Sequence, residues 1–210
     1  MNDKPNEFTN DKLVQGENSS SQNSSNGISE LIDYVEIFIV AICAVMLLFT
    51  VFVRTCTVDG DSMNNTLLNK EQLLISDVLY TPERQDIIVF HNNDGTTNGQ
   101  NNKPLVKRVI GVAGDTVTID NTSQTVTVTT KDGEVQILQE DYTYFDPARL
   151  DPFYGVQKFT VPEGKLFVMG DNRLASLDSR YTAIGFVDER SVLGKVYFRI
   201  SPISKIGIIK

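Results

Sequence analysis

Apolar and polar positions divide the chain into three parts. Residues 1–27 are rich in Asn, Ser, Asp and Lys and hold almost no large apolar side chains. Such a composition buries too little surface to offset the entropy lost on ordering, so it predicts a disordered tail. The run Ile37–Val53 has seventeen residues without a charge and is closed by Arg54. At about 1.5 Å per residue, a helix of this length covers about 25 Å, close to the hydrocarbon thickness of a bilayer.

This apolar run predicts one retained transmembrane helix within residues 28–54, with a buried core helix as the alternative. A cleaved secretory signal fits poorly, because the run follows a long polar tail, lacks a basic n-region and ends without an A-x-A site. A lipoprotein signal ending at Cys56 does not fit either, because Arg54 lies inside its window. The flanking Lys and Arg residues set no clear orientation, and Arg54 argues against an external C-terminal part.

From residue 55 onward, short runs of β-type residues are separated by turn signals such as K-D-G at 131–133. Thr116–Thr130 alternates in two runs and predicts a hairpin around residues 121–123. No long helical period follows, so residues 55–210 are predicted to form a mainly β domain, an antiparallel sheet curled into a barrel-like shape. The predicted strands are Gln72–Ser76, Asp86–His91, Leu105–Val112, Thr116–Asp120, Thr125–Thr130, Glu134–Leu138, Lys158–Val161, Lys165–Met169 and Gly194–Ser201.

Charge and cysteine content narrow the choice of partners. Residues 1–54 carry 3 of the 19 Lys and Arg and 7 of the 27 Asp and Glu, which leaves 16 and 20 for the β domain. A mildly acidic domain without a basic stripe argues against a nucleic-acid partner. A helix would hold Cys43 and Cys56 too far apart for a disulfide. The chain has one histidine and no C-x-x-C or H-E-x-x-H spacing, so no metal is expected.

Ser62 is a candidate nucleophile close to the membrane. It lies in V-D-G-D-S-M, nine residues after Val53, so an extended chain places it within about 30 Å of the helix end. Gly60 frees the backbone to turn and to leave the Ser62 N–H as an oxyanion donor. Taken alone, a serine in this context is more often a plain turn residue.

A lysine is the better candidate to activate this serine. His91 ends the run D-I-I-V-F-H and is expected to be a strand-end or turn residue, which leaves a serine-lysine dyad. In the strand P-L-V-K-R-V-I, Lys107 and Arg108 point to opposite faces, so one cation must lie among apolar neighbours. Arginine keeps its proton, whereas a desolvated lysine loses its own readily and can accept the proton of Ser62. The alternative is that Lys107 extends to water.

The segment 168–181, V-M-G-D-N-R-L-A-S-L-D-S-R-Y, places many polar groups directly after an apolar strand. Polar groups beside a core strand need mutual hydrogen-bond partners. An Asp–Arg pair could fix this loop and a hydroxyl could orient the lysine amine; the alternative is a salt-bridged surface loop. The polar residues are Asp171, Asn172, Arg173, Ser176, Asp178, Ser179 and Arg180.

Together these segments resemble the type I signal peptidase family. The nucleophile motif S-M-x-P-T-L stands as S-M-N-N-T-L at 62–67, and K-R-V-x-G-x-x-G-D is complete at 107–115. The motif G-D-N-R-x-x-S-x-D-S-R is complete at 170–180, and R-Q-D-I-I-V-F at 84–90 is similar to R-G-D-I-V-V-F. The resemblance covers roughly residues 31–205, in the family's order, with a membrane helix ahead of the serine.

The resemblance implies a role for each motif residue. Ser62 would attack the scissile carbonyl, Lys107 would be the general base, and Ser176 would hydrogen-bond the lysine amine. The Ser62 N–H would form part of the oxyanion hole, without the extra hydroxyl that some members have where this chain has Gly60. The residues that would hold the surrounding loop are Asp171, Asp178 and Arg180. The residues that would line a shallow pocket for small side chains are Met63, Leu105 and Val106.

Two departures from the motifs stand out. Asn65 replaces a proline that would stiffen the turn after the nucleophile, and Gln85 replaces a glycine. Between the motifs, residues 116–164 form the region where the family varies most, here expected to be a small cap. Its aromatics are expected to pack in the cap core, with the lipid interface as the alternative. They are Tyr142, Tyr144, Phe145, Phe153 and Tyr154.

The sequence thus predicts a single-pass serine endopeptidase on the extracytoplasmic side of a bacterial plasma membrane. Its partners would be the bilayer and secretory preproteins with A-x-A-type signal peptides, cut after small residues, without cofactor or nucleic acid. Two alternatives stay open: a non-catalytic signal-peptidase-like assembly factor for surface proteins, and a self-cleaving serine-lysine repressor. The latter requires a DNA-binding helix pair where this chain has its apolar run. The preproteins, a housekeeping or dedicated role and the oligomeric state stay open.

Overall fold

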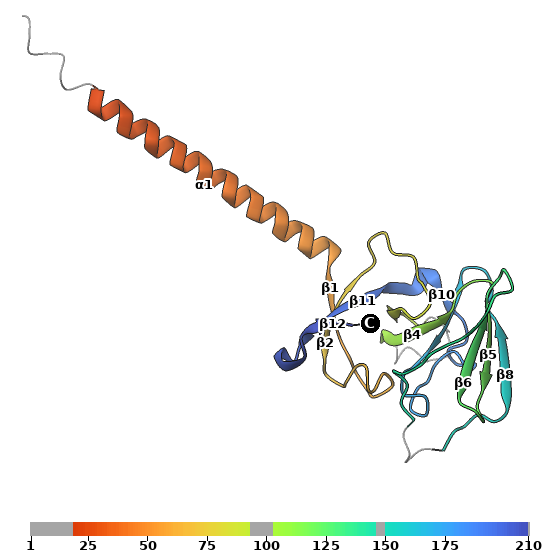
Figure 1. Cartoon of the computed structure of the whole chain (residues 1–210). Coiled ribbons are helices and arrows are strands. Elements are labelled where there is room, and N and C mark those ends of the chain that lie inside the picture. Colours follow the sequence, from red (N-terminus) through yellow and green to blue (C-terminus); the bar gives the residue numbers. More distant parts are fainter. Residues whose placement is uncertain (1–18, 93–102, 146–149, 210) are drawn as a thin grey trace, which may run out of the picture. The chain divides into compact units, whose positions relative to one another are not determined.

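The computed structural model describes residues 19–92, 103–145 and 150–209. The chain divides into two units, Met1–Thr50 and Val51–Lys210. Helix α1 (Ser19–Phe52) accounts for the described residues of the first unit, and the second is mainly β (Figure 1). The mainly β prediction is therefore confirmed.

Helix α1 begins earlier than the sequence indicated. It starts at Ser19, so residues 19–27 are helical and not disordered, whereas residues 1–18 of the predicted tail lie outside the described residues. Extending an existing helix adds one hydrogen bond for each residue that is fixed, so a polar segment can continue a helix that it could not nucleate. Within the described part of the chain, no helix combines the length and apolar character that crossing a bilayer requires. The side chains at positions 48, 49, 51 and 52 of the predicted span lie outside the described set.

The larger sheet has eight antiparallel strands in the order β1-β2-β11-β3-β4-β9-β10, with β12 also paired to β11. Strand β11 pairs with β2, β3 and β12, and its register shifts three times along these partners. Such bulges bend a strand and increase its twist, which curls the sheet. The strands are β1 (Arg54–Thr57), β2 (Gln72–Ser76), β3 (Ile87–Phe90), β4 (Leu105–Gly111), β9 (Lys165–Met169), β10 (Val187–Asp188), β11 (Val192–Ser201) and β12 (Gly207–Ile208).

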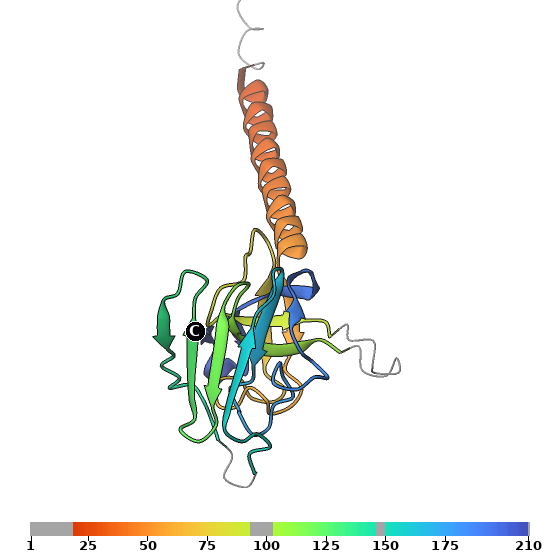
Figure 2. The same cartoon turned by 90° about the vertical axis from the view of Figure 1, so that its right-hand side faces the viewer.

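The smaller sheet is built from the segment between the two long motifs. It has the antiparallel order β7-β6-β5-β8. Strands β5, β6 and β8 lie side by side in both views (Figure 1, Figure 2). The predicted hairpin is present as β5 and β6, whose valine and isoleucine side chains are buried while the threonines between them are not. The strands are β5 (Thr116–Asp120), β6 (Thr125–Thr129), β7 (Val135–Ile137) and β8 (Val156–Thr160). Two short 3-10 helices, η1 (Glu189–Ser191) and η2 (Ile203–Lys205), flank β11.

The two sheets share a core. One buried cluster joins Ile110, Phe167 and Met169 of the larger sheet to Val117 and its neighbours in the smaller one. Gly111 makes this approach possible, because a Cβ there would lie 2.6 Å from a methyl carbon of Val117. The end of β4 is thereby fixed against the second sheet, and β4 carries the candidate lysine.

Gln85 offers a test of backbone strain at one of the two motif departures. Its φ is 74°, in the left-handed region, which costs an L-residue about 1–2 kcal/mol and glycine little. We expect Gln85→Gly to raise the free energy of unfolding by about 0.5–1 kcal/mol, since the entropy of the unfolded glycine offsets part of the relief. Urea denaturation of the full chain in detergent micelles measures this change.

The matched control is Gln72→Gly, which changes an exposed glutamine in the extended backbone of β2. Here glycine relieves no strain, so stability should fall by about 0.5–1 kcal/mol. Equal losses in the two variants would show that the backbone at Gln85 carries no strain.

Candidate active site

Ser62 and Lys107 meet although 45 positions separate them in the sequence. Lys107 lies on β4 opposite Ile88 of β3, and its Nζ donates a hydrogen bond of 2.8 Å to Ser62 Oγ. A second hydrogen bond of 3.0 Å, to the carbonyl oxygen of Val106, fixes the amine. A neutral lysine amine in this position can accept the hydroxyl proton of the serine.

Burial lowers the proton affinity of Lys107. The residue is 3% exposed and has no carboxylate within ion-pair distance among the described residues. Burial lowers the pKa of Lys107 to about 8, and the charges of Asp178 and Asp171 oppose that shift. Burial penalises the ammonium form because it removes the hydration that stabilises a charge. A substantial fraction of the amine is therefore neutral in mildly alkaline solution.

Lys107 and its neighbour Arg108 are both buried, whereas the alternation along the strand required only one of the two cations to be buried. Arg108 is 2% exposed, and its guanidinium donates to Asp171 through Nε at 2.9 Å and Nη2 at 2.8 Å. Its Nη1 donates to the carbonyl oxygen of Gln85, and the ring of Tyr142 lies 3.9 Å from its central carbon. A bidentate carboxylate and an aromatic face replace the lost water, so Arg108 stays charged in the interior.

The loop after β9 is held by buried ion pairs. Asp178 is fully buried and accepts hydrogen bonds from Arg180 and from the Gly170 N–H. Burial alone would raise the pKa of the Asp178 carboxyl, but Arg180, the Gly170 N–H and the Ser176 hydroxyl hold that pKa below its usual value. Arg180 also donates to the carbonyl oxygen of Arg173. The loop is therefore an internal network and not a salt-bridged surface loop.

Two further pairings in this region were not predicted. Arg173 binds Glu140 of the segment between the motifs through both guanidinium nitrogens Nη1 and Nη2. Phe153 packs 5.0 Å from the central carbon of Arg180, whereas Tyr154 is 85% exposed. Tyr142 and Phe153 thus stack on the arginines of the site and do not form a separate cap core.

Ser176 lies beside Ser62. The Lys107 amine donates hydrogen bonds to Ser62 and Val106, and among the described residues none joins it to the Ser176 hydroxyl. A Cβ built on Gly170 would lie 2.2 Å from Ser176 Oγ and 2.5 Å from the carbonyl oxygen of Ser62. Gly170 therefore lets the two serine segments come together. Ser176 Oγ is buried, and its contact with Asp178 lacks the geometry of a proper hydrogen bond. A bond from Ser176 to the Lys107 amine stays a prediction.

Asn172, in the G-D-N-R motif at 170–180, also holds the backbone at Ser62 and at the residue before it. The Asn172 N–H donates to the carbonyl oxygen of Ser62 at 3.0 Å, and its side-chain amide donates to that of Asp61 at 3.1 Å. Thr66 Oγ1 donates to Asp171. The Ser62 N–H itself donates no hydrogen bond among the described residues. Sequence reasoning assigned no role to Thr66 or Asn172, although both stand inside the motifs.

The three predicted pocket residues fall in two core clusters. Met63 and Val106 are 1% and 8% exposed and belong to the cluster beneath the turn that follows β1. Leu105 is half-buried and packs against the neighbouring cluster around Phe90. Their contact with a substrate side chain stays a prediction.

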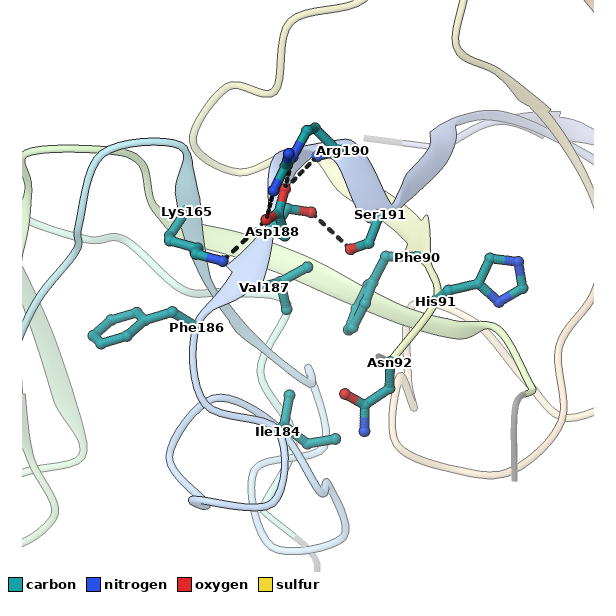
Figure 3. A pocket seen from close by; sticks show the side chains of 10 residues that line it. All are labelled: Phe90, His91, Asn92, Lys165, Ile184, Phe186, Val187, Asp188, Arg190 and Ser191. Atoms are coloured by element: carbon teal, nitrogen blue, oxygen red, sulfur yellow. Dashed lines mark hydrogen bonds and ion pairs between the residues drawn. The ribbon is translucent and has the colours of Figure 1, made fainter. Parts of the chain in front are cut away.

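His91 lies at a different place, where it follows β3 and lines a cavity of about 430 Å³ (Figure 3). In this cavity Asp188 binds Lys165 and Arg190, and neither Ser62 nor Lys107 contributes to the lining. This position agrees with the strand-end prediction and leaves Lys107 as the partner of the serine. Among the described residues, no three His, Cys, Asp or Glu side chains are grouped to hold a metal ion.

Comparisons with known proteins identify the family of the chain. The family model for signal peptidase, peptidase S26, matches residues 31–201. Signal peptidase IB of Staphylococcus aureus is 32% identical over 185 residues, 84% of this chain and 92% of that protein. Signal peptidase I P of Bacillus subtilis subsp. natto is 31% identical over 181 residues, 85% and 93% of the two chains. A crystal structure of a signal peptidase I from Enterococcus faecalis V583 is 32% identical and covers 55% of this chain and 97% of that one, with a TM-score of 0.40.

The chain therefore belongs to the signal peptidase family, peptidase S26, and it is a peptidase. The resemblance drawn from the motifs is confirmed.

Asp171→Asn tests how strongly the site depends on its buried ion pairs. The substitution keeps the side-chain volume but leaves Arg108 charged, buried and without its carboxylate. Removing one partner of a buried pair costs about 3–5 kcal/mol, so we expect a loss of that order in the free energy of unfolding. Denaturant unfolding of the full chain in micelles measures it.

Asp188→Asn serves as the control, because Asp188 also pairs with cations, but both side chains reach solvent: Arg190 is 90% exposed and Lys165 37%. Solvent screens these pairs, so the loss should be far smaller. If the two variants lost the same stability, the Arg108–Asp171 pair would not be a major support of the site.

Proposed function

We propose that this peptidase is a membrane-anchored serine endopeptidase that removes signal peptides from secreted preproteins, with Ser62 as nucleophile and Lys107 as general base. The observation that carries the proposal is the 2.8 Å hydrogen bond from the buried Lys107 amine to Ser62 Oγ. A serine needs an adjacent base to become a nucleophile, and a lysine with a pKa of about 8 can supply it near neutral pH.

The geometry supports an acyl-transfer mechanism. Neutral Lys107 takes the proton of Ser62 as Oγ attacks the scissile carbonyl carbon, and the unpaired Ser62 N–H donates to the developing oxyanion. The ammonium of Lys107 then gives its proton to the leaving amine, and the acyl group stays on Ser62. Water attacks the ester with Lys107 again as base, which releases the signal peptide and restores the serine.

The other predicted site residues hold the reacting groups in place. Asp171 neutralises Arg108 and anchors Thr66, while Asp178 and Arg180 hold the segment that carries Ser176. Ser176 would orient the lysine amine. The residues that would receive the small side chains of an A-x-A substrate are Met63, Leu105 and Val106. An extended substrate segment would dock as an added strand.

The membrane anchor is proposed for α1. Its apolar side chains are exposed along the helix, as with Phe38 at 64%, Val40 at 60% and Leu47 at 68%. A helix that is apolar all round needs cover, and an uncharged run of about 25 Å suits the lipid core. The serine follows the run closely in sequence, so the peptidase domain would act near the membrane surface. The family resemblance places that surface on the extracytoplasmic side of a plasma membrane.

Cleavage by the purified full chain in detergent tests the proposal. The substrate is a preprotein with an A-x-A site, and Ser62→Ala and Lys107→Ala are compared with wild type. Each variant removes a reacting group, so we expect kcat to fall at least about 10³-fold. Mass spectrometry of the products identifies the cleaved bond.

Ser191→Ala and Lys165→Ala are the matched controls, because both residues line the separate cavity. They should cleave as wild type does. Activity that persists in Ser62→Ala would refute the assigned nucleophile. A wild type that is inert where a known signal peptidase cleaves would favour the non-catalytic assembly factor.

A further inference from the structure

The turn that carries Ser62 is also held by residues that lie outside the motifs. It leads from β1 to β2, and it has Asn65 where the resembling family has proline. A proline would restrict this backbone by fixing one dihedral angle. Two charged residues outside the motifs, Glu71 and Arg199, contact the turn instead.

Arg199 reaches the turn from β11, 133 positions later in the sequence. Its Nη2 donates a hydrogen bond of 2.6 Å to the carbonyl oxygen of Thr66. Its Nε lies 3.0 Å from Glu71 Oε2, an ion pair in which the Nε–H is not directed at that oxygen. The arginine side chain is 16% exposed, so water screens these contacts only weakly.

Glu71 ties the end of the turn to its beginning. The residue is 3% exposed, and its Oε2 accepts the Leu68 N–H at 3.0 Å. Its backbone carbonyl accepts the Val58 N–H at 2.9 Å, just after β1. Lys205 lies 3.9 Å from Oε1, which has no hydrogen-bond partner. The carboxylate thus orients Arg199 while it closes the turn on itself.

Thr66 is held at two atoms from opposite elements. Its hydroxyl donates to Asp171 of the third motif, and its carbonyl accepts from Arg199 of β11. We propose that Arg199, oriented by Glu71, is a positioning residue that fixes the turn and so directs Ser62 Oγ at Lys107. It supplies through charge the rigidity that a proline would give at Asn65. The inference rests on the proposed function of Ser62 and Lys107.

This role has a specific kinetic signature. Arg199 makes no contact with Lys107 among the described hydrogen bonds and ion pairs, so its loss should leave the lysine environment unchanged. The pH at which kcat/KM is half-maximal, set by deprotonation of Lys107 in the free enzyme as pH rises, should therefore stay near 8. Misplacing a reacting atom by about 1 Å costs about 100-fold in rate, so the plateau kcat should fall.

The experiment compares Arg199→Ala and Arg199→Lys with wild type, using the full chain in micelles and a short A-x-A peptide. We expect Arg199→Ala to lose about 100-fold in kcat with little change in KM and in the pH midpoint. Arg199→Lys should lose less, because an ammonium keeps the charge beside Glu71 but lacks the planar guanidinium that reaches the Thr66 carbonyl. Arg190→Ala, which removes an exposed paired arginine, should match wild type.

Asn65→Pro in the Arg199→Ala background separates positioning from general stability. The Asn65 N–H donates no hydrogen bond among the described residues, so proline there removes none. If rigidity of the turn is what Arg199 supplies, the double variant should recover about 10-fold or more of the lost kcat.

Two results would overturn the inference. One is a wild-type kcat in Arg199→Ala. The other is a loss that Asn65→Pro does not restore and that tracks a fall in thermal stability, since that marks general destabilisation. Arg199→Lys keeps the test decisive if the alanine variant does not fold, because wild-type kcat in Arg199→Lys would also count against positioning by the guanidinium. An inert wild type would instead refute the proposed function itself.

Discussion

The burial of one lysine without a carboxylate is the constraint on which the site depends. Four cations are buried among the described residues, and three are arginines with their own acids: Arg108 with Asp171, Arg173 with Glu140 and Arg180 with Asp178. Only Lys107 has none. Because these acids are paired with arginines, none of them forms an ion pair with Lys107. Burial therefore lowers the pKa of Lys107, although the charges of Asp178 and Asp171 oppose that shift.

The fold serves this arrangement by joining segments that are distant in sequence. Strand β4 carries Lys107 and Arg108 on opposite faces, and both side chains are buried. The face of Arg108 is covered by Tyr142 and by the smaller sheet. The Ser62 turn is fixed against this strand by the loop after β9 and by β11. Glycine at position 170 allows the close approach of the turn to that loop. The backbone around the serine is thus held by other elements as well as by hydrogen bonds within the turn.

Strong local patterns predicted much of the fold. Three strands, including Thr116–Asp120, have the predicted bounds, because alternation and flanking turns mark them clearly. Strands β10 and β12 have two residues each, too few to show a period, and β1 (R-T-C-T) has no apolar alternation. The motifs identified Ser62 and Lys107 as the candidate nucleophile and general base. The partners of Arg108 and Arg173, and the contact of Arg199 with Thr66, arise from tertiary packing that no local spacing encodes.

The central claim is that Lys107 loses its proton near pH 8 in the folded protein, well below an ordinary lysine, and its titration tests that claim directly. The full chain, carrying lysine labelled with carbon-13 at Cε, is titrated by NMR in micelles, and Lys107→Ala identifies the signal. The account predicts one lysine with a pKa of about 8, well below about 10.4 for ordinary lysines. A Lys107 signal that titrates with the other lysines would mean a charged amine at neutral pH and would contradict the account.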